Sequence, residues 1–205
     1  IWDRATSKAL VSIDCPCGRG TRLTFSNDAK KAALAGLDHS ISLMSLRHPA
    51  ALQRLGQHED LVFDMVFSVD DRWLASAAKD GRVIMWDVEG ARPAWQAQGD
   101  WQFTVAMTSD GGRVVHGDFH GRLHVRDGRS GKLQRTLEAH PAAQILAVAI
   151  SRDGRRALSG GNDRKVMLWD LETGARLRVF EGHAGEITEV GFDAEAGDDA
   201  RTALL

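Results

Sequence analysis

Short apolar runs separated by polar, glycine-rich turns recur along the whole chain. In the clearest example, residues 151–170, a tight turn closing on Asp163 joins two apolar runs at 156–160 and 165–171, a pattern typical of a β-hairpin. Further strand-like runs at 145–150 and 177–180 flank this hairpin, and no segment has a long helical period. The pattern predicts an all-β protein built from four-stranded units.

The unit returns at a nearly constant spacing. The positions equivalent to Trp169 are residues 2, 44, 86 and 126, so successive equivalents lie 42, 42, 40 and 43 residues apart. A turn containing Ser and Asp keeps the same period, at 26–28, 68–70, 109–111 and 151–153. Two landmarks with one period indicate a repeat architecture. Complete units are expected at 21–55, 62–97, 102–137 and 144–180.

A repeat of this length, with Gly-His near its start and Trp-Asp near its end, resembles the WD-repeat family of β-propellers. Gly182-His183 matches the Gly-His pair, and Trp-Asp stands at three of its five expected places. The resemblance implies an all-β propeller of four-stranded antiparallel blades. The amino-acid sequence of the repeat at residues 154–174 also resembles repeats found in large bacterial multidomain proteins.

The ends of the chain fall inside blades. Ile1 is equivalent to Leu168 and Leu205 to Leu158, so the last strand of one partial blade is expected near 9–13. The first strands of another are expected at 187–192 and 202–205. Because an open stack leaves strand edges unpaired, we expect residues 1–205 to form one domain that is a piece of a longer, seven-bladed or larger propeller.

In the WD-repeat family a His, a Ser or Thr, an Asp and the Trp are joined by hydrogen bonds within a blade, and two blades of this chain match that tetrad. Its members here are His58, Ser76, Asp80 and Trp86, and again His140, Ser159, Asp163 and Trp169. Ser, His and Asp could also form a hydrolase triad. Recurrence of the set in two repeats favours the structural interpretation, and no nucleophile-elbow pattern surrounds either serine. We therefore expect no catalytic residue and no enzyme activity.

The blade of Arg126 departs from this pattern, with Asp100 in the place of His, His116 in the place of Ser and His120 in the place of Asp. We interpret this as an inverted acid–imidazole pair, Asp100 with either His120 or His116. Alternatively, His116, His120 and His124 could provide a divalent metal with ligands. The variant tetrad is the favoured interpretation, and we expect no metal or cofactor.

Composition and charge narrow the partners and the compartment. A formal net charge of −2 provides no concentration of Lys and Arg, so neither nucleic acid nor a membrane surface is an expected partner. No window approaches the length of a membrane span, and the first residues lack a signal-peptide pattern. The two cysteines, Cys15 and Cys17, are too few for a disulfide framework. We therefore expect a cytoplasmic protein.

The function implied by the resemblance is a non-catalytic platform that binds another protein or another domain of its own chain. Its face is expected to be formed by loops, because the blades fix them without requiring specific side chains there. The residues implied for that face are Lys79, Trp101, Phe119, Gln144, Asn162 and Glu186. Two alternatives are a sensory or regulatory propeller within a larger bacterial multidomain protein and a metal-binding propeller that uses the histidine hairpin.

Overall fold

The computed structural model of the chain describes residues 6–8, 20–48, 52–192 and 202–203, and the regular elements among them are all strands. Sixteen strands form four antiparallel sheets in which neighbours along the chain pair in order. Blade 1 contains β1 (Gly20–Phe25), β2 (Lys31–Gly36), β3 (Ser40–Ser45) and β4 (Leu52–Gln57). Blade 2 contains β5 (Val62–Phe67), β6 (Trp73–Ala78), β7 (Arg82–Asp87) and β8 (Arg92–Gln98).

The other two sheets repeat this arrangement. Blade 3 contains β9 (Gln102–Met107), β10 (Arg113–Asp118), β11 (Arg122–Asp127) and β12 (Leu133–Glu138). Blade 4 contains β13 (Ile145–Ile150), β14 (Arg156–Gly161), β15 (Val166–Asp170) and β16 (Arg176–Phe180). The predicted all-β fold of four-stranded antiparallel blades is confirmed.

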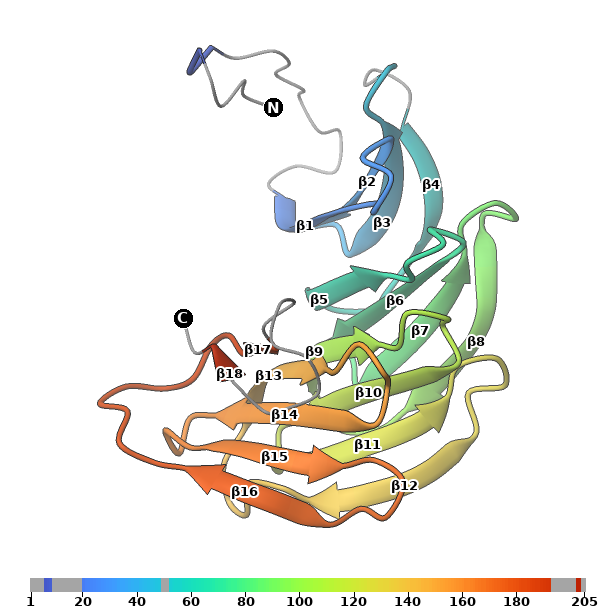
Figure 1. Cartoon of the computed structure of the whole chain (residues 1–205). Helices are drawn as coiled ribbons and strands as arrows, with labels where there is room; N and C mark the ends of the chain where they lie inside the picture. Colours follow the sequence, from blue (N-terminus) through green and yellow to red (C-terminus); the bar gives the residue numbers. More distant parts are fainter. Residues whose placement is uncertain (1–5, 9–19, 49–51, 193–201, 204–205) are drawn as a thin grey trace.

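The four blades are arranged as an arc with their first strands innermost (Figure 1). Contacts between β1 and β5, between β5 and β9, and between β9 and β13 join neighbouring blades at this inner side. Strands β4, β8, β12 and β16 lie outermost (Figure 1). Because each sheet is an antiparallel meander, alternate turns of the chain emerge at the same end of the blades. This topology gathers residues from many repeats on one face.

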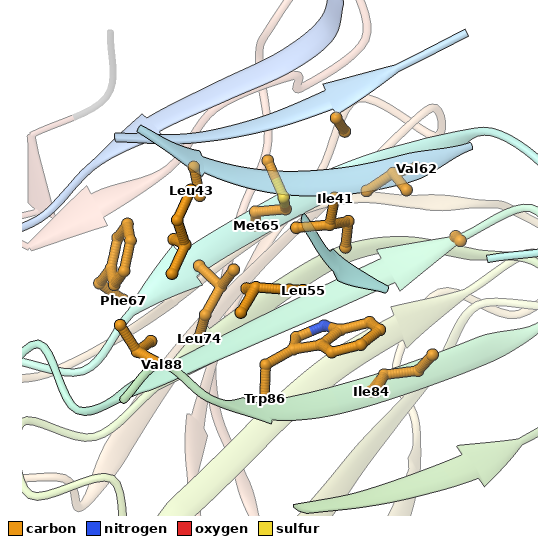
Figure 2. Close-up of a cluster of buried hydrophobic side chains, with 13 residues drawn as sticks. Ile41, Leu43, Leu55, Val62, Met65, Phe67, Leu74, Ile84, Trp86 and Val88 are labelled. Atoms are coloured by element: carbon orange, nitrogen blue, oxygen red, sulfur yellow. The ribbon is translucent and has the colours of Figure 1, made fainter. Parts of the chain in front are cut away.

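The hydrophobic core lies between adjacent sheets rather than within one. Ile41 and Leu43 of blade 1 pack against Met65, Leu74 and Trp86 of blade 2 (Figure 2). Similar clusters of buried side chains join blade 2 to blade 3 and blade 3 to blade 4. Each blade is therefore stabilised through its neighbours, as expected of a repeat protein.

The prediction of a strand over 187–192 is wrong in its first part. Only β17 (Gly191–Phe192) is a strand, and it pairs with β18 (Thr202–Ala203). Instead of pairing in a sheet of its own, Ile187 donates its backbone N–H to the carbonyl of Gly161 at 3.1 Å, and its buried side chain packs against Leu158 and Leu168. Residues 2–3, 9–13, 15 and 17 lie outside the described part of the chain.

The described residues contain no helix that is long and apolar enough to cross a membrane.

Gly121 in the turn between β10 and β11 provides a test of the packing between blades. It has φ +77°, and a Cβ there would lie 1.9 Å from the carbonyl oxygen of His140 in the adjoining loop. Gly121→Ala is expected to lower the free energy of unfolding by more than about 1 kcal/mol, because the cost of the strained backbone conformation and the cost of the clash are both incurred. The control, Gly185→Ala, is expected to have little effect, since no atom lies within 4 Å of its Cβ position. Guanidinium denaturation would measure both, and equal stabilities would contradict the assignment of Gly121.

Candidate functional site

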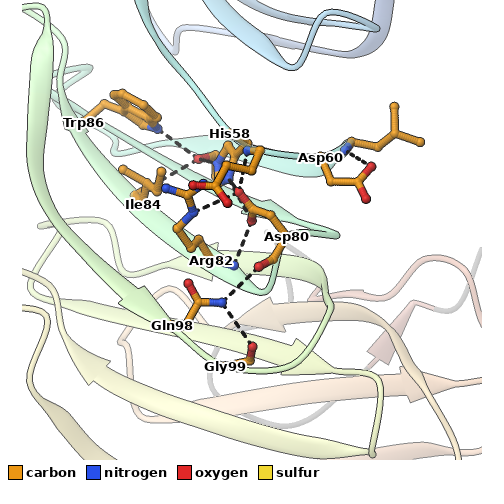
Figure 3. Close-up of polar contacts among 11 residues, drawn as sticks. His58, Asp60, Asp80, Arg82, Ile84, Trp86, Gln98 and Gly99 are labelled. Atoms are coloured by element: carbon orange, nitrogen blue, oxygen red, sulfur yellow. Dashed lines mark hydrogen bonds and ion pairs between the residues drawn. The ribbon is translucent and has the colours of Figure 1, made fainter.

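The blade 2 tetrad is a continuous hydrogen-bonded string (Figure 3). His58 Nδ1 lies 3.0 Å from the Asp80 carboxylate, and its Nε2 lies 2.7 Å from Ser76 Oγ. The indole N–H of Trp86 donates to the same Oγ at 2.9 Å. Since a carboxylate only accepts, Nδ1 carries the ring proton and Nε2 accepts from the serine hydroxyl. Strands β6 and β7 are thereby tied to the loop before β5.

Asp80 is fixed by several donors. Burial alone would raise its pKa, but hydrogen bonds from His58 and from the backbone N–H groups of Glu59 and Arg82 hold the pKa well below its usual range. Arg82 Nε also donates to the carboxylate at 2.9 Å. The ionised carboxylate therefore keeps the histidine in one tautomer at neutral pH.

The blade 4 tetrad has the same geometry. His140 Nδ1 lies 3.0 Å from Asp163, His140 Nε2 lies 2.8 Å from Ser159 Oγ, and Trp169 Nε1 donates to that Oγ at 3.0 Å. Ser159 and His140 have no exposed surface, and the same is true of Ser76 in blade 2. A nucleophile must reach its substrate, so neither serine is placed to act as one.

In blade 3 the structure does not form the predicted pair between Asp100 and His116. Asp100 instead forms an ion pair with Arg122. His120 Nε2 lies 3.7 Å from Asp100, a surface contact in which both side chains are about half exposed. His116 is buried and lies in a different network. Of the two predicted pairings of Asp100, the one with His116 is therefore not formed, whereas the one with His120 is present as a longer contact beside the ion pair with Arg122.

The string that connects the strands of blade 3 contains Gln102, His116 and Arg126. His116 Nδ1 lies 2.6 Å from Gln102 Oε1, and Arg126 Nε donates to His116 Nε2 at 2.9 Å. Because a guanidinium cannot accept a hydrogen bond, Nε2 is the acceptor and Nδ1 is protonated. With His116 in the serine place and Arg126 in the tryptophan place, Gln102 thus takes the role of the tetrad histidine, which contacts the serine in blades 2 and 4. Sequence analysis missed Gln102 because it lies within β9, whereas the tetrad histidines lie in the loop before the first strand of the blade.

A second string in blade 3 runs from Asp118 through His124 to Thr136. His124 Nε2 lies 3.0 Å from Asp118 and its Nδ1 lies 3.1 Å from Thr136. Burial raises the pKa of Asp118, but hydrogen bonds from His124 and Arg122 outweigh it and lower that pKa to about 2. The nitrogens of His116 and His124 all contact protein groups. Among the described residues no group of three or more His, Cys, Asp or Glu side chains is placed to hold a metal.

The exposed part of the site is a ridge of aromatic side chains. Trp101 and Phe119 lie edge to face with ring centroids 5.3 Å apart, and Lys79 Nζ lies 5.1 Å above the Trp101 ring. Phe119 stacks on Phe103 with ring centroids 6.3 Å apart, and Phe103 stacks on Phe63 with ring centroids 5.0 Å apart. We call these four aromatic residues and Lys79 the aromatic ridge. It joins three residues predicted for the binding face and two that sequence analysis missed.

Phe63 and Phe103 were missed because each stands within an apolar strand and resembles a core residue in sequence. Each is the second residue of the innermost strand of its blade. Both line a hollow of about 370 Å³ between the inner strands. The sequence signal that could have identified them is that both occupy the same position of the repeat, the second residue of the first strand.

The remaining predicted face residues lie beside blade 4. Asn162 Oδ1 accepts from the backbone N–H of Gln144 at 3.0 Å, and the Asn162 N–H donates to the Gln144 carbonyl at 3.2 Å. These two residues thus join two loops and are partly buried. Glu186 is exposed in the segment between β16 and β17.

The repeated meander, the packing between sheets and the tetrads together define the blades of a β-propeller. Residues 50–87 and 131–170 match the family model described as "WD domain, G-beta repeat". The chain therefore belongs among the WD-repeat proteins, as its resemblance predicted.

Two relatives show how the chain compares with longer proteins. Over 138 residues it is 31% identical to a rice protein (Oryza sativa subsp. japonica) described as "U3 snoRNP-associated protein-like YAOH", covering 67% of this chain and 22% of that protein. Over 215 residues it is 24% identical to a potato (Solanum tuberosum) "Guanine nucleotide-binding protein subunit beta", covering 94% of this chain and 56% of that protein. The chain thus spans between about a fifth and somewhat over half of these curated relatives.

The energetic role of the tetrads can be tested at Ser159. Ser159→Ala is expected to lower the free energy of unfolding by about 1–3 kcal/mol, because it leaves a buried imidazole nitrogen and a buried indole N–H without partners. Ser42→Ala is the matched control, because Ser42 is also a buried strand serine but belongs to neither tetrad. Denaturant unfolding would compare the two, and an equal loss would argue against the string as the cause.

The burial of His116 leads to a prediction about how the free energy of unfolding depends on pH. Burial, together with His124 and Arg126, lowers the pKa of His116 well below the ordinary 6.5. Between the folded and unfolded pKa values the unfolded chain binds more protons, so His116 reduces stability as the pH falls from about 7 to about 5. In His116→Asn the slope of unfolding free energy against pH over this range is expected to become shallower. The exposed control, His120→Asn, is expected to retain it, and a His116→Asn slope equal to that of the wild type would contradict the assignment.

Proposed function

We propose that the chain is a non-catalytic binding platform that engages another protein, or another domain of its own chain, through the aromatic ridge. The observation that carries this proposal is the exposure of two preordered aromatic rings on loops. Trp101 is 44% exposed and Phe119 is 38% exposed, yet each ring is held by neighbours. Rigid aromatic anchors lose little conformational entropy on binding and are enriched among the residues that dominate interface energies.

The interior chemistry supports a platform rather than an enzyme. The Ser, His and Asp residues that would attract a catalytic interpretation are engaged with one another inside the blades. The histidine hairpin is explained by its hydrogen bonds within blade 3, so we do not retain the metal-binding alternative. The aromatic ridge, in contrast, presents exposed rings to a partner.

We also infer that the chain forms one propeller domain with further blades. Leu23 and Phe25 on β1 are about half exposed, whereas Met65 and Phe67, at the same register on β5, are buried against blade 1. The face of blade 1 therefore has the composition of an interface with another blade. The short share of each relative that the chain spans supports membership in a longer protein.

The partner class and compartment follow from charge and composition. A net charge of −2 favours a protein partner over nucleic acid or a membrane, and we propose a cytoplasmic location. The rice relative is described by its association with a U3 snoRNP. By analogy, a protein component of a ribonucleoprotein is one partner class for this chain. A sensory or regulatory role within a larger protein is compatible with this platform, but the bacterial likeness has no counterpart in the two plant relatives.

A capture experiment with full-length protein would test the platform. Trp101→Ala and Phe119→Ala are each expected to reduce recovery of bound partners by about tenfold or more, because each removes a central aromatic anchor. Leu133→Ala on the outer strand β12 is the matched control, since Leu133 is 45% exposed but lies at the end of the blades opposite the aromatic ridge. Quantitative mass spectrometry would compare the four proteins. Equal recovery by all four would reject this face as the binding site.

A further inference from the structure

Charge is divided unequally between the two ends of the blades. The end that contains the aromatic ridge includes the described loops at 37–39, 58–61, 79–81, 99–101, 119–121, 139–144 and 162–165 and the segment 181–190. These carry nine Asp or Glu residues and three Lys or Arg residues. The described loops at the other end are 26–30, 46–48, 68–72, 88–91, 108–112, 128–132, 151–155 and 171–175. They carry seven of each sign.

With histidines neutral, the end with the ridge therefore has a loop charge of −6, from three minus nine, while the other end is neutral. The whole-chain charge of −2 hides this asymmetry. Several of the carboxylates are well exposed, with side-chain exposures of 80% for Glu59, 48% for Asp100 and 64% for Glu181, and each also forms an ion pair, with Arg82, Arg122 and Lys165 respectively. Exposed charges of one sign around an apolar centre attract a partner of the opposite sign and repel a similar one.

The ridge and its surroundings impose two requirements on one ligand. The exposed faces of Trp101 and Phe119 require an apolar or aromatic side chain to cover them. Lys79 lies above one face of Trp101 and also contacts Asp60 at 3.6 Å, so this cation belongs to the platform and needs no acidic partner. The net negative charge of the surrounding loops favours positive charge on either side of the apolar group.

We propose that the ligand of this face is a basic peptide segment in which an apolar or aromatic side chain is flanked by Lys or Arg. The inference rests on the proposed function, because it assigns a chemical class to the partner of the same face. Charge complementarity excludes a second copy of the same face as the preferred occupant, since two surfaces of −6 would repel. It also disfavours a nucleic-acid phosphate backbone at this end of the blades.

Selection of short random peptides on the full-length chain would test the ligand class. The enriched peptides are expected to carry net positive charge around an apolar residue. Their synthetic versions are expected to lose about tenfold or more in affinity for Trp101→Ala, measured by fluorescence anisotropy. Glu186→Lys is expected to weaken them by about threefold or more, because it reverses one exposed acidic charge on this face. The affinity is expected to fall as ionic strength rises.

Two control variants separate the contributions. Glu89→Lys reverses an exposed charge at the opposite end, and Leu133→Ala removes an exposed apolar group from the outer strand. Both are expected to bind the peptides as the wild type does. If the enriched peptides depend on Trp101 but are neutral or acidic, the charge inference is overturned while the binding face stands. If no peptide is enriched, or if binding is indifferent to Trp101→Ala, both the inference and the proposed face are overturned.

Discussion

The fold depends on the burial of each sheet against its neighbours. A four-stranded sheet has two faces, and the buried clusters of this protein each combine side chains from adjacent blades. At roughly 1.5–3 kcal/mol for each large apolar side chain removed from water, these interfaces are the main source of stability. The tetrads contribute less to the free energy of unfolding than the apolar interfaces do. Their role is to fix the position of the loop before a blade relative to the second and third strands of that blade.

Comparison of the blades shows which part of the tetrad is essential. Blades 2 and 4 use an acid, an imidazole, a hydroxyl and an indole, whereas blade 3 uses an amide, an imidazole and a guanidinium. In blade 1, Leu34 and Met44 occupy the hydroxyl and indole places, and the remaining Asp38 accepts hydrogen bonds from Ser40. What all the polar strings share is a donor for every buried acceptor, which is the condition for burying polar groups at all. Identity of the side chains is secondary to that condition.

The sequence was sufficient for the fold and for two of the four polar strings, and the reason is periodicity. A repeat gives several independent views of the same local structure, so a turn or strand that is ambiguous once becomes clear by alignment. The string of Gln102, His116 and Arg126 in blade 3 could not be predicted in this way, because Gln and Arg do not stand at the equivalent places of the other repeats. The ion pair of Asp100 with Arg122 was missed for a related reason: alignment identifies which place a residue occupies, whereas this contact depends on three-dimensional distance. Phe63 and Phe103 were hidden because a strand residue facing the inner hollow has the same hydrophobic character as one in the core.

The separation of chemistry from recognition follows from the same architecture. The hydrogen-bonding groups that recur in blades 2 and 4 are buried together with their partners, so residues that look reactive in the sequence have a structural role. Exposed loop residues do not need buried hydrogen-bond partners, so their side chains can differ from blade to blade. Trp101 and Phe119 are an example, because they lie in loops at one end of the blades. Together with the two phenylalanines of the inner strands they form the exposed aromatic ridge. Because the meander sends alternate turns to opposite ends, substitutions in alternate loops accumulate on the same surface. Acidic residues can therefore concentrate at one end of the blades while the overall charge stays near zero.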